Sequence, residues 1–210
     1  MKLAIFGSTG QTGQQLVEQA LAGGHIVRTI ARRPLAISSQ NLHVETGSIF
    51  DATAVTVCAA GADAVLSVVG FGSSLFRTPV PAESYSGVAS ALVHSMRTAG
   101  VGRLLFCTSA GVEDDPSEIW VYRHVLKPLI LQKEYVRMAA GEAIIKASGL
   151  DWTCVRPGRL TNGPLTQTYR VADGRRPAGG TFVSRADVAH FFIAEALASN
   201  WVHKSPTLAM

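Results

Sequence analysis

The chain contains little cysteine and little charge. Its 210 residues include three cysteines, Cys58, Cys107 and Cys154, and 16% charged residues. The cysteines lie far apart, each in an apolar run, so their spacing supports neither a disulfide framework nor a zinc site, and we expect no metal centre. A reducing, cytoplasmic location is therefore predicted. The apolar fraction of 47% is ordinary and excludes a disordered chain or a coiled coil.

Long hydrophobic runs and long basic runs are also missing. The apolar start ends at a glycine-rich loop, too early for a signal peptide, and the most apolar window, 54–72, carries Asp63 and three glycines. The 19 basic residues exceed the 15 acidic ones, giving a net charge of +4, but no five basic residues are consecutive. We therefore expect no nucleic-acid or membrane partner, whereas a small polyanionic ligand would suit the charge.

Apolar segments of strand length alternate with helical patterns along most of the chain. The predicted strands are residues 3–6, 26–31, 42–45, 64–69, 103–108 and 152–156, and the predicted helices are 14–22, 52–60, 85–99 and 132–147. Repeated strand–helix–strand units require parallel pairing, because each helix crosses back over the sheet. The pattern predicts an α/β fold with a doubly wound parallel sheet of the Rossmann type.

The last quarter of the chain has a different character. Residues 158–180 are rich in glycine, proline and polar residues, with a short strand predicted at 169–171. Ser184 is predicted to cap a helix that runs to about residue 197, with Asp187 three residues on. No internal repeat is visible. We expect one domain over 1–210, in which about 157–210 form a small elaboration on the substrate side of the sheet.

A glycine-rich loop follows the first predicted strand. GSTGQTG spaces Gly7, Gly10 and Gly13 three apart, directly before a helix. Gly7 permits a tight turn, Gly10 lets the backbone approach a diphosphate, and Gly13 lets the helix pack close to the sheet. The diphosphate would lie on the N–H groups at the positive end of the helix, with hydroxyl donors from Thr9 and Thr12. A tight turn without a ligand is the alternative.

The end of the second strand distinguishes between the two nicotinamide cofactors. Arg32 and Arg33 stand 19 and 20 residues after Gly13, where NAD-specific sites usually carry an acid. A guanidinium can pair with a 2′-phosphate through two hydrogen bonds, whereas a carboxylate would repel it. The sequence therefore predicts NADP(H) as the cofactor, with ordinary surface charges as the alternative.

Two more loops follow the carboxyl ends of predicted strands. Gly70 and Gly72 come after the fourth strand, either close to the cofactor or in a loop without that role. The fifth strand ends in CTSAG, which places Thr108 and Ser109 at the edge where open α/β sheets bind their ligands. Ser109 is the candidate catalytic residue beside the nicotinamide, and a capping serine is the alternative.

The usual acid of alcohol dehydrogenation is missing from the chain. Short-chain dehydrogenases use a tyrosine with a lysine four residues later, but the residue at that spacing is Ala89, Leu126, Ala139 or Asp173. No GxSxG, HExxH or P-loop motif occurs. Hydride transfer would then need a conjugated acceptor, such as a flavin, quinone or tetrapyrrole, whose reduced anion can take a proton from water. A nucleotide-sugar epimerase is disfavoured by the same missing pair and by the small C-terminal region.

Several longer motifs are similar to those of a known family. They are AIFGSTGQTG at the start, CTSA at 107–110, SGLDW at 148–152, GPLTQTY at 163–169, DGRRP at 173–177 and SRADVAHFF at 184–192. Together they resemble the atypical short-chain dehydrogenases with an NAD(P)H-binding fold, especially the biliverdin-IXβ reductase and flavin reductase group, over almost the whole chain. The resemblance implies an NADPH-dependent reductase of flavins or related planar acceptors. A non-enzymatic NADP(H)-binding redox sensor of the NmrA-like type is the alternative.

The resemblance also implies roles for individual residues. It assigns the diphosphate to the residues of the glycine-rich loop, the 2′-phosphate to Arg32 and the adenine region to Ile49. It assigns the nicotinamide side to a further set of residues, and Ser109 is the active-site serine. The loop residues are Gly7, Thr9, Gly10, Gln11, Thr12 and Gly13, and the nicotinamide set is Gly70, Cys107 and Pro157, to which Thr108 is added as a cofactor-binding candidate.

Three positions depart from the pattern of that group. Ser48, which is kept as a cofactor-binding candidate, replaces an acid near the adenine. Met138 and Arg159 replace histidines, so the acceptor pocket is expected to differ and biliverdin itself is not assumed. The substrate-side candidates are Arg159 together with Trp120, Tyr122 and Arg123, which are expected in part of a lid, with core packing of the aromatics as the alternative. The oligomeric state is left open.

Overall fold

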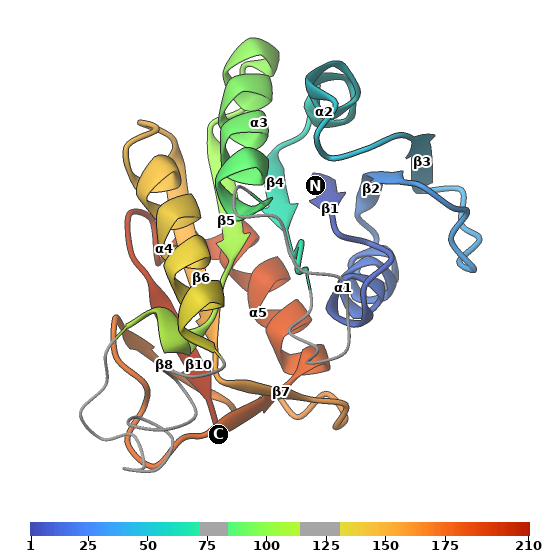
Figure 1. Cartoon of the computed structure of the whole chain (residues 1–210). Helices are drawn as coiled ribbons and strands as arrows, with labels where there is room; N and C mark the ends of the chain where they lie inside the picture. The colour runs from blue at the N-terminus through green and yellow to red at the C-terminus, as the bar shows by residue number, and fades with distance from the viewer. Residues whose placement is uncertain (72–83, 114–130) are drawn as a thin grey trace.

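The centre of the sheet is built from the most apolar segments of the chain. The structure is a computed structural model that describes residues 1–71, 84–113 and 131–210 (Figure 1). Almost every residue is buried in β1 (Lys2–Phe6), β4 (Ala64–Ser67) and β5 (Arg103–Cys107). Strands that are covered on both faces form continuous apolar runs, and these three strands accordingly lie side by side in the middle.

The main sheet has eight strands in the order β3-β2-β1-β4-β5-β6-β10-β8. The outer strands are β2 (Ile26–Ala31), β3 (Leu42–Thr46), β6 (Asp151–Pro157), β8 (Arg170–Asp173) and β10 (Pro206–Ala209). All neighbouring strands are parallel except β10 and β8, which are antiparallel. The predicted doubly wound α/β sheet is confirmed. Its order reverses between β1 and β4, and open sheets of this kind bind ligands in the crevice outside the carboxyl ends of such strands.

Helices cover both faces of the sheet (Figure 1). One face carries α1 (Gln11–Ala22) and α5 (Arg185–Ala198), and the other carries α2 (Ala52–Ala59), α3 (Ser84–Ala99) and α4 (Gln132–Lys146). Successive side chains of β1 point to opposite faces of the sheet. Leu3 and Ile5 pack under α1 and α5, and Ala4 and Phe6 pack under α2 and α3. Among the described residues, none of the helices combines the length and apolarity that crossing a bilayer requires.

The C-terminal quarter contributes to the sheet as well as lying over its end. β10 pairs in parallel with β6, and its four residues, PTLA, are too few to show a strand pattern in the sequence. β7 (Arg159–Thr161) and β9 (Phe182–Ser184) form a small separate parallel sheet. The predicted cap is confirmed, because Ser184 Oγ accepts a hydrogen bond of 2.9 Å from the Asp187 N–H at the start of α5.

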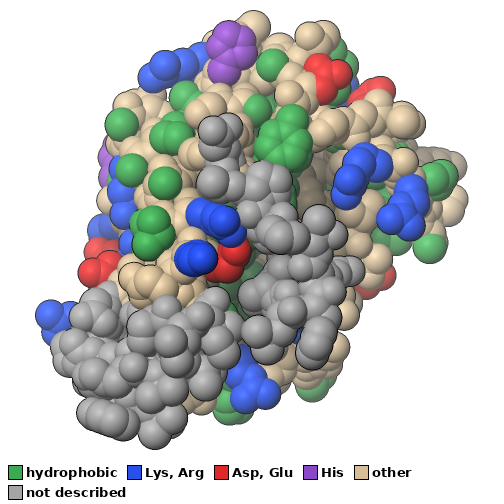
Figure 2. Space-filling model, in the orientation of Figure 1, with side chains coloured by type: hydrophobic (Ala, Val, Ile, Leu, Met, Phe, Trp, Pro, Cys, Tyr) green, Lys and Arg blue, Asp and Glu red, His purple; other side chains and the backbone are tan. Residues whose placement is uncertain are grey.

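The charged side chains are distributed over the molecule. In the space-filling view, the described Lys and Arg side chains are spread across the visible face and do not gather into one patch (Figure 2). This face therefore has no broad basic surface, and individual Lys and Arg side chains that line cavities are the candidates for binding an anion.

Candidate functional site

Three glycines shape the loop between β1 and α1, for different reasons. Gly7 has φ of 92°, in the left-handed region that strains other residues. A Cβ on Gly13 would lie 2.0 Å from the Gly7 carbonyl oxygen, so the helix can pack on the loop only without a side chain there. Gly10 has φ of −78°, and the nearest atom to a Cβ would be the Gly7 oxygen at 3.3 Å. Backbone conformation and packing within the protein therefore require glycine at positions 7 and 13. At position 10 they require it far less, and close approach of a ligand to the backbone would explain glycine there.

The start of α1 carries backbone donors without acceptors. Gly10 is the N-cap and offers no side chain, and the first helical hydrogen bond runs from Gln14 N–H to Gly10 O at 2.8 Å. The N–H groups of Gln11, Thr12 and Gly13 therefore have no acceptor within the described part of the chain. Free donors and the positive end of the helix dipole together form a site for an anion.

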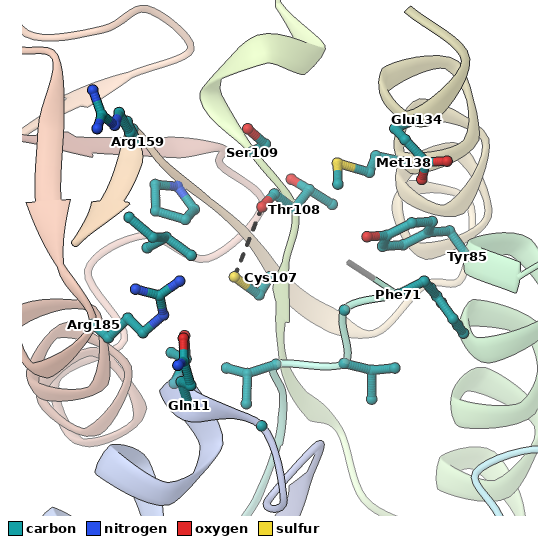
Figure 3. Close-up of a pocket in the computed structure, with 18 of the residues that line it drawn as sticks. Gln11, Phe71, Tyr85, Cys107, Thr108, Ser109, Glu134, Met138, Arg159 and Arg185 are labelled. Carbon is teal, nitrogen blue, oxygen red and sulfur yellow. Dashed lines mark hydrogen bonds between the residues drawn. The ribbon is translucent and has the colours of Figure 1, made fainter. Parts of the chain in front are cut away.

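A cavity of about 840 Å³ opens above this helix start (Figure 3). Its floor and walls come from the segments that follow β1, β4, β5 and β6: residues 9–12, 68–71, 107–109 and 157–160. The helices add Tyr85 from α3, then Glu134, Tyr135 and Met138 from α4, and Arg185 from α5. The cavity thus lies at the carboxyl edge of the sheet, and its volume is within the range of small-molecule and cofactor sites.

A second cavity of about 360 Å³ adjoins the first. It is lined by Thr9, Gln14, Arg32, Arg33 and residues 34–36, and Thr9 belongs to both cavities. The guanidinium groups of Arg32 and Arg33 have no hydrogen-bond or ion-pair partner among the described residues. Two cationic groups therefore border a cavity that shares Thr9 with the larger cavity above the start of α1.

The two hydroxyl residues that follow β5 differ in what their side chains can offer. Ser109 Oγ accepts a hydrogen bond of 3.3 Å from Gly111 N–H and so caps the short turn η1 (Ala110–Val112), while the residue also lines the cavity. Its own proton remains available to a ligand. Thr108 Oγ1 instead donates to Glu142 Oε1 at 2.7 Å, so its hydroxyl is already used inside the protein.

A buried ion pair lies behind Thr108. Arg156 donates from Nε to Glu142 Oε1 at 2.9 Å and from Nη2 to Oε2 at 2.6 Å, and both side chains are almost fully buried. Burial would raise the pKa of Glu142, but hydrogen bonds from Arg156, Lys146 and Thr108 outweigh it and hold the pKa below the usual 4.5. The ionised carboxylate therefore ties α4 to the ends of β5 and β6, which carry the cavity residues Thr108 and Pro157.

Cys107 brings a neutral thiol to the cavity wall. Burial raises its pKa to about 12, so the thiolate does not form near neutral pH. This side chain therefore offers an apolar, uncharged surface and no nucleophile, in keeping with a position beside an aromatic ring.

Two tyrosines line the cavity although the sequence has no tyrosine–lysine pair. The Tyr85 ring points into the cavity (Figure 3), and burial raises its pKa to about 12 even though the Phe71 N–H donates to it. The Tyr135 ring lies on Gly111, where a Cβ would come 2.2 Å from the Tyr135 Cζ atom. No lysine is present among the described lining residues. Neither tyrosine therefore has, among the described lining residues, the neighbouring ammonium group that activates the phenol in the paired arrangement.

Several of these lining residues were not predicted from the sequence. They are Val68, Val69, Phe71, Tyr85, Leu131, Glu134, Tyr135, Gly158, Leu160 and Arg185. One signal was available: Glu134 and Met138 are four residues apart in α4 and so share a helix face with Tyr135. For Tyr85 and Arg185 no local pattern exists, because α3 and α5 meet the cavity only through the tertiary packing.

The candidates named from the sequence separate into groups. Thr9, Gly10, Gln11, Thr12, Gly70, Cys107, Thr108, Ser109, Pro157 and Arg159 line the large cavity, and Arg32 lines the second. Gly7 and Gly13 shape the loop without lining either cavity. Ser48 and Ile49 also line neither: Ile49 packs against the core, and Ser48 Oγ accepts from Phe50 N–H at 3.3 Å. Gly72, Trp120, Tyr122 and Arg123 lie outside the described residues.

Comparison with known proteins agrees with this geometry. Residues 7–199 match the model of a family described as NAD(P)H-binding. The chain therefore belongs to the NAD(P)H-binding family, and its cofactor is a nicotinamide nucleotide.

The relatives and solved structures that the chain resembles include named reductases and a named epimerase. It is 27% identical over 179 residues to the (4-alkanoyl-5-oxo-2,5-dihydrofuran-3-yl)methyl phosphate reductase of Streptomyces griseus, covering 84% of this chain and 53% of that enzyme. The anaerobillin reductase ChuY of Escherichia coli O157:H7 has a similar fold, with a TM-score of 0.78 and 23% identity over 100% of this chain and 97% of that one. Another relative, named the uncharacterized sugar epimerase YhfK of Bacillus subtilis, is 29% identical over 203 residues, 92% of this chain and 87% of that protein.

Proposed function

We propose that this protein is an NADPH-dependent reductase that transfers hydride to a planar conjugated acceptor, such as a flavin, quinone or tetrapyrrole. One observation carries the proposal. A single cavity brings together the free donors of α1, the hydroxyl of Ser109 and several apolar and aromatic side chains, and it adjoins the two guanidinium groups of Arg32 and Arg33.

The chain's own residues fit the cofactor part by part. The N–H groups of residues 11–13 would hold the diphosphate, and Arg32 and Arg33 would pair with the 2′-phosphate. Gly70, Cys107 and Pro157 would flank the nicotinamide with uncharged surface. When bound there, NADPH supplies the hydride that reduces the acceptor.

The proton donors in the cavity favour a conjugated acceptor. Ser109 keeps its proton free, and Tyr85 stays protonated near neutral pH because its pKa is raised to about 12. Both are weak acids, so they suit an acceptor whose negative charge is delocalised, with positioning and exclusion of water contributing most of the rate. The same feature argues against epimerase chemistry, which depends on the tyrosine–lysine pair.

The proposal includes a partner and a location. The partner is a small conjugated acceptor rather than a nucleic acid or a membrane. Cys58, Cys107 and Cys154 are all free thiols, which suits a reducing cytoplasmic compartment, where NADPH is also kept reduced.

Oxidation of NADPH over a panel of acceptors tests the proposal. The panel holds FMN, riboflavin, menadione and a linear tetrapyrrole, with an aliphatic ketone and a nucleotide sugar as controls. We expect turnover with at least one conjugated acceptor and none with the controls. Ser109→Ala should lower kcat by about 100-fold, the low end for a positioned proton donor, and leave the Kd for NADPH unchanged. Tight binding of both NADP⁺ and NADPH without hydride loss to any acceptor would contradict the proposal and favour a redox sensor.

A further inference from the structure

Arg185 reaches the cavity from the C-terminal part of the chain. It is the first residue of α5 and lines the same cavity as Gly10, Gln11 and Thr12. In Figure 3 its guanidinium lies on the same side of the cavity as the Gln11 side chain at the start of α1. Its Nη1 donates to Asn162 Oδ1 at 2.7 Å. This hydrogen bond holds one end of the guanidinium, on a side chain that lines the same cavity as the start of α1.

The packing of α5 on α1 explains this position. The two helices lie against each other on one face of the sheet, and Gln19 Nε2 of α1 donates to the Ala186 carbonyl oxygen of α5 at 3.0 Å. The two helix starts differ. α5 is capped by the Ser184 hydroxyl and carries the Asp187 carboxylate in its first turn, whereas α1 has neither a side-chain cap nor an acid in its first turn. An anion is therefore expected at α1, with Arg185 beside it.

Arg185 differs from the two buried arginines of the fold, Arg103 and Arg156, which are paired with carboxylates. Like Arg97 and Arg170 it donates to a neutral oxygen, but unlike them it lines the cavity. Within the described residues, Arg185 has only the neutral oxygen of Asn162 as an acceptor, which leaves donors of its planar fork and its full charge uncompensated. A phosphate group, which can accept two parallel hydrogen bonds, matches the remaining N–H donors and the positive charge of this guanidinium.

We propose that Arg185 is a cofactor-binding residue whose guanidinium pairs with the diphosphate held at the start of α1, and that Asn162 positions it. This inference rests on the proposed function for the identity of the ligand. It adds a contact from the opposite end of the chain, so that the diphosphate is held between the glycine-rich loop and α5. Because NADPH and NADH share the diphosphate, Arg185 contributes to the affinity for both, whereas Arg32 contributes only where a 2′-phosphate is present.

Binding measurements on single variants separate these two roles. Calorimetric titration gives Kd for NADPH, NADH, ADP-ribose and adenosine 2′-monophosphate with the wild type, Arg185→Gln, Arg185→Lys and Arg32→Gln. Arg185→Gln should raise Kd for NADPH, NADH and ADP-ribose by the same factor, about 10- to 100-fold for a lost charged hydrogen bond, and leave adenosine 2′-monophosphate unchanged. Arg32→Gln should instead raise Kd for NADPH and adenosine 2′-monophosphate and leave NADH and ADP-ribose unchanged. Arg185→Lys should fall between Arg185→Gln and the wild type.

A matched control and a structural check accompany these titrations. Arg175→Gln removes an exposed arginine that lines neither cavity, and it should leave every Kd unchanged. Circular dichroism and the Tm of each variant without ligand show whether the fold is intact. Asn162→Ala should weaken NADPH and NADH equally, by less than Arg185→Gln does, because it frees the guanidinium without removing it.

The possible results distinguish this inference from the proposed function. Unchanged Kd values for NADPH and NADH in a folded Arg185→Gln, with a wild type that binds both, would overturn the role of Arg185 and leave the proposed function standing. A higher KM for the acceptor alone would overturn it too and place Arg185 on the acceptor. A wild type that binds neither nucleotide would overturn the proposed function itself.

Discussion

Single side chains in the cavity differ in whether their polar atoms are already used. Ser109 accepts from Gly111 N–H and keeps its proton, whereas the Thr108 hydroxyl is committed to Glu142. The sequence places both residues at the edge of the sheet, because they follow a buried strand. It does not indicate which hydroxyl is free, since Glu142 lies 34 residues further along the chain and reaches Thr108 only through the packing of α4.

Arg32 is the residue on which the choice of cofactor depends. Arg32→Asp replaces a guanidinium that can pair with a 2′-phosphate by a carboxylate that repels it. We expect the affinity for NADPH to fall by about 2–3 kcal/mol and the affinity for NADH to change much less. Titration of both cofactors at low and high salt measures the difference. Equal losses for the two would remove the preference for NADPH.

At the scale of elements, the loop and α1 form one unit whose glycines have separate tasks. The triplet is evident in the sequence because its spacing is local. The helix begins at Gln11, three residues earlier than the predicted position 14, and Gly13 therefore lies inside it. Glycine has a low helix propensity, so the sequence pattern places the predicted start of the helix after Gly13. Contact with the Gly7 carbonyl is what makes glycine necessary there.

Alanine at two of these glycines should separate binding from folding. Gly13→Ala places a Cβ 2.0 Å from the Gly7 oxygen, and we expect it to lower the free energy of unfolding by about 3 kcal/mol or more. Gly10→Ala should cost at most about 1 kcal/mol as a cap change, yet raise Kd for NADPH at least about tenfold. Urea unfolding and titration measure the two effects. Gly102→Ala, where the nearest atom to a Cβ is Asp151 Oδ2 at 3.8 Å, is the control for both. A stable Gly10→Ala with unchanged affinity would contradict a diphosphate at this loop.

Over the whole molecule, two buried carboxylates join parts that are distant in the sequence. Glu142 links α4 to β5 and β6. Asp187 accepts hydrogen bonds from Ser184 Oγ and from the backbone N–H groups of Thr166 and Gln167, which ties these two residues to the first turn of α5. The GPLTQTY and SRAD motifs are therefore one structural unit. Burial alone would raise the pKa of Asp187, but these hydrogen bonds lower it below the usual 3.8.

The pH dependence of stability should reflect both carboxylates. Their pKa values are lowered on folding, so the unfolded chain binds more protons and stability rises with pH. Their contribution is complete above the unfolded values of 4.5 and 3.8 and is lost as the pH falls through the lower folded values. Urea unfolding at a series of pH values should show this decline. Asp187→Asn should be less stable than the wild type near neutral pH and decline less steeply in acid. A variant with the same slope as the wild type would contradict the assignment.

The sheet and the edge at which a ligand is expected can be predicted from the sequence, because buried strands, glycine spacing and the Ser184 cap are local patterns. The set of side chains that share the cavity follows from the packing of distant segments. Tyr85, Tyr135 and Arg185 come from three helices, and β10 joins the sheet through pairing with β6 rather than through its own four residues. The physical reason is that contacts between distant segments depend on how helices pack across the sheet, and the spacing of residues along the chain does not record that packing.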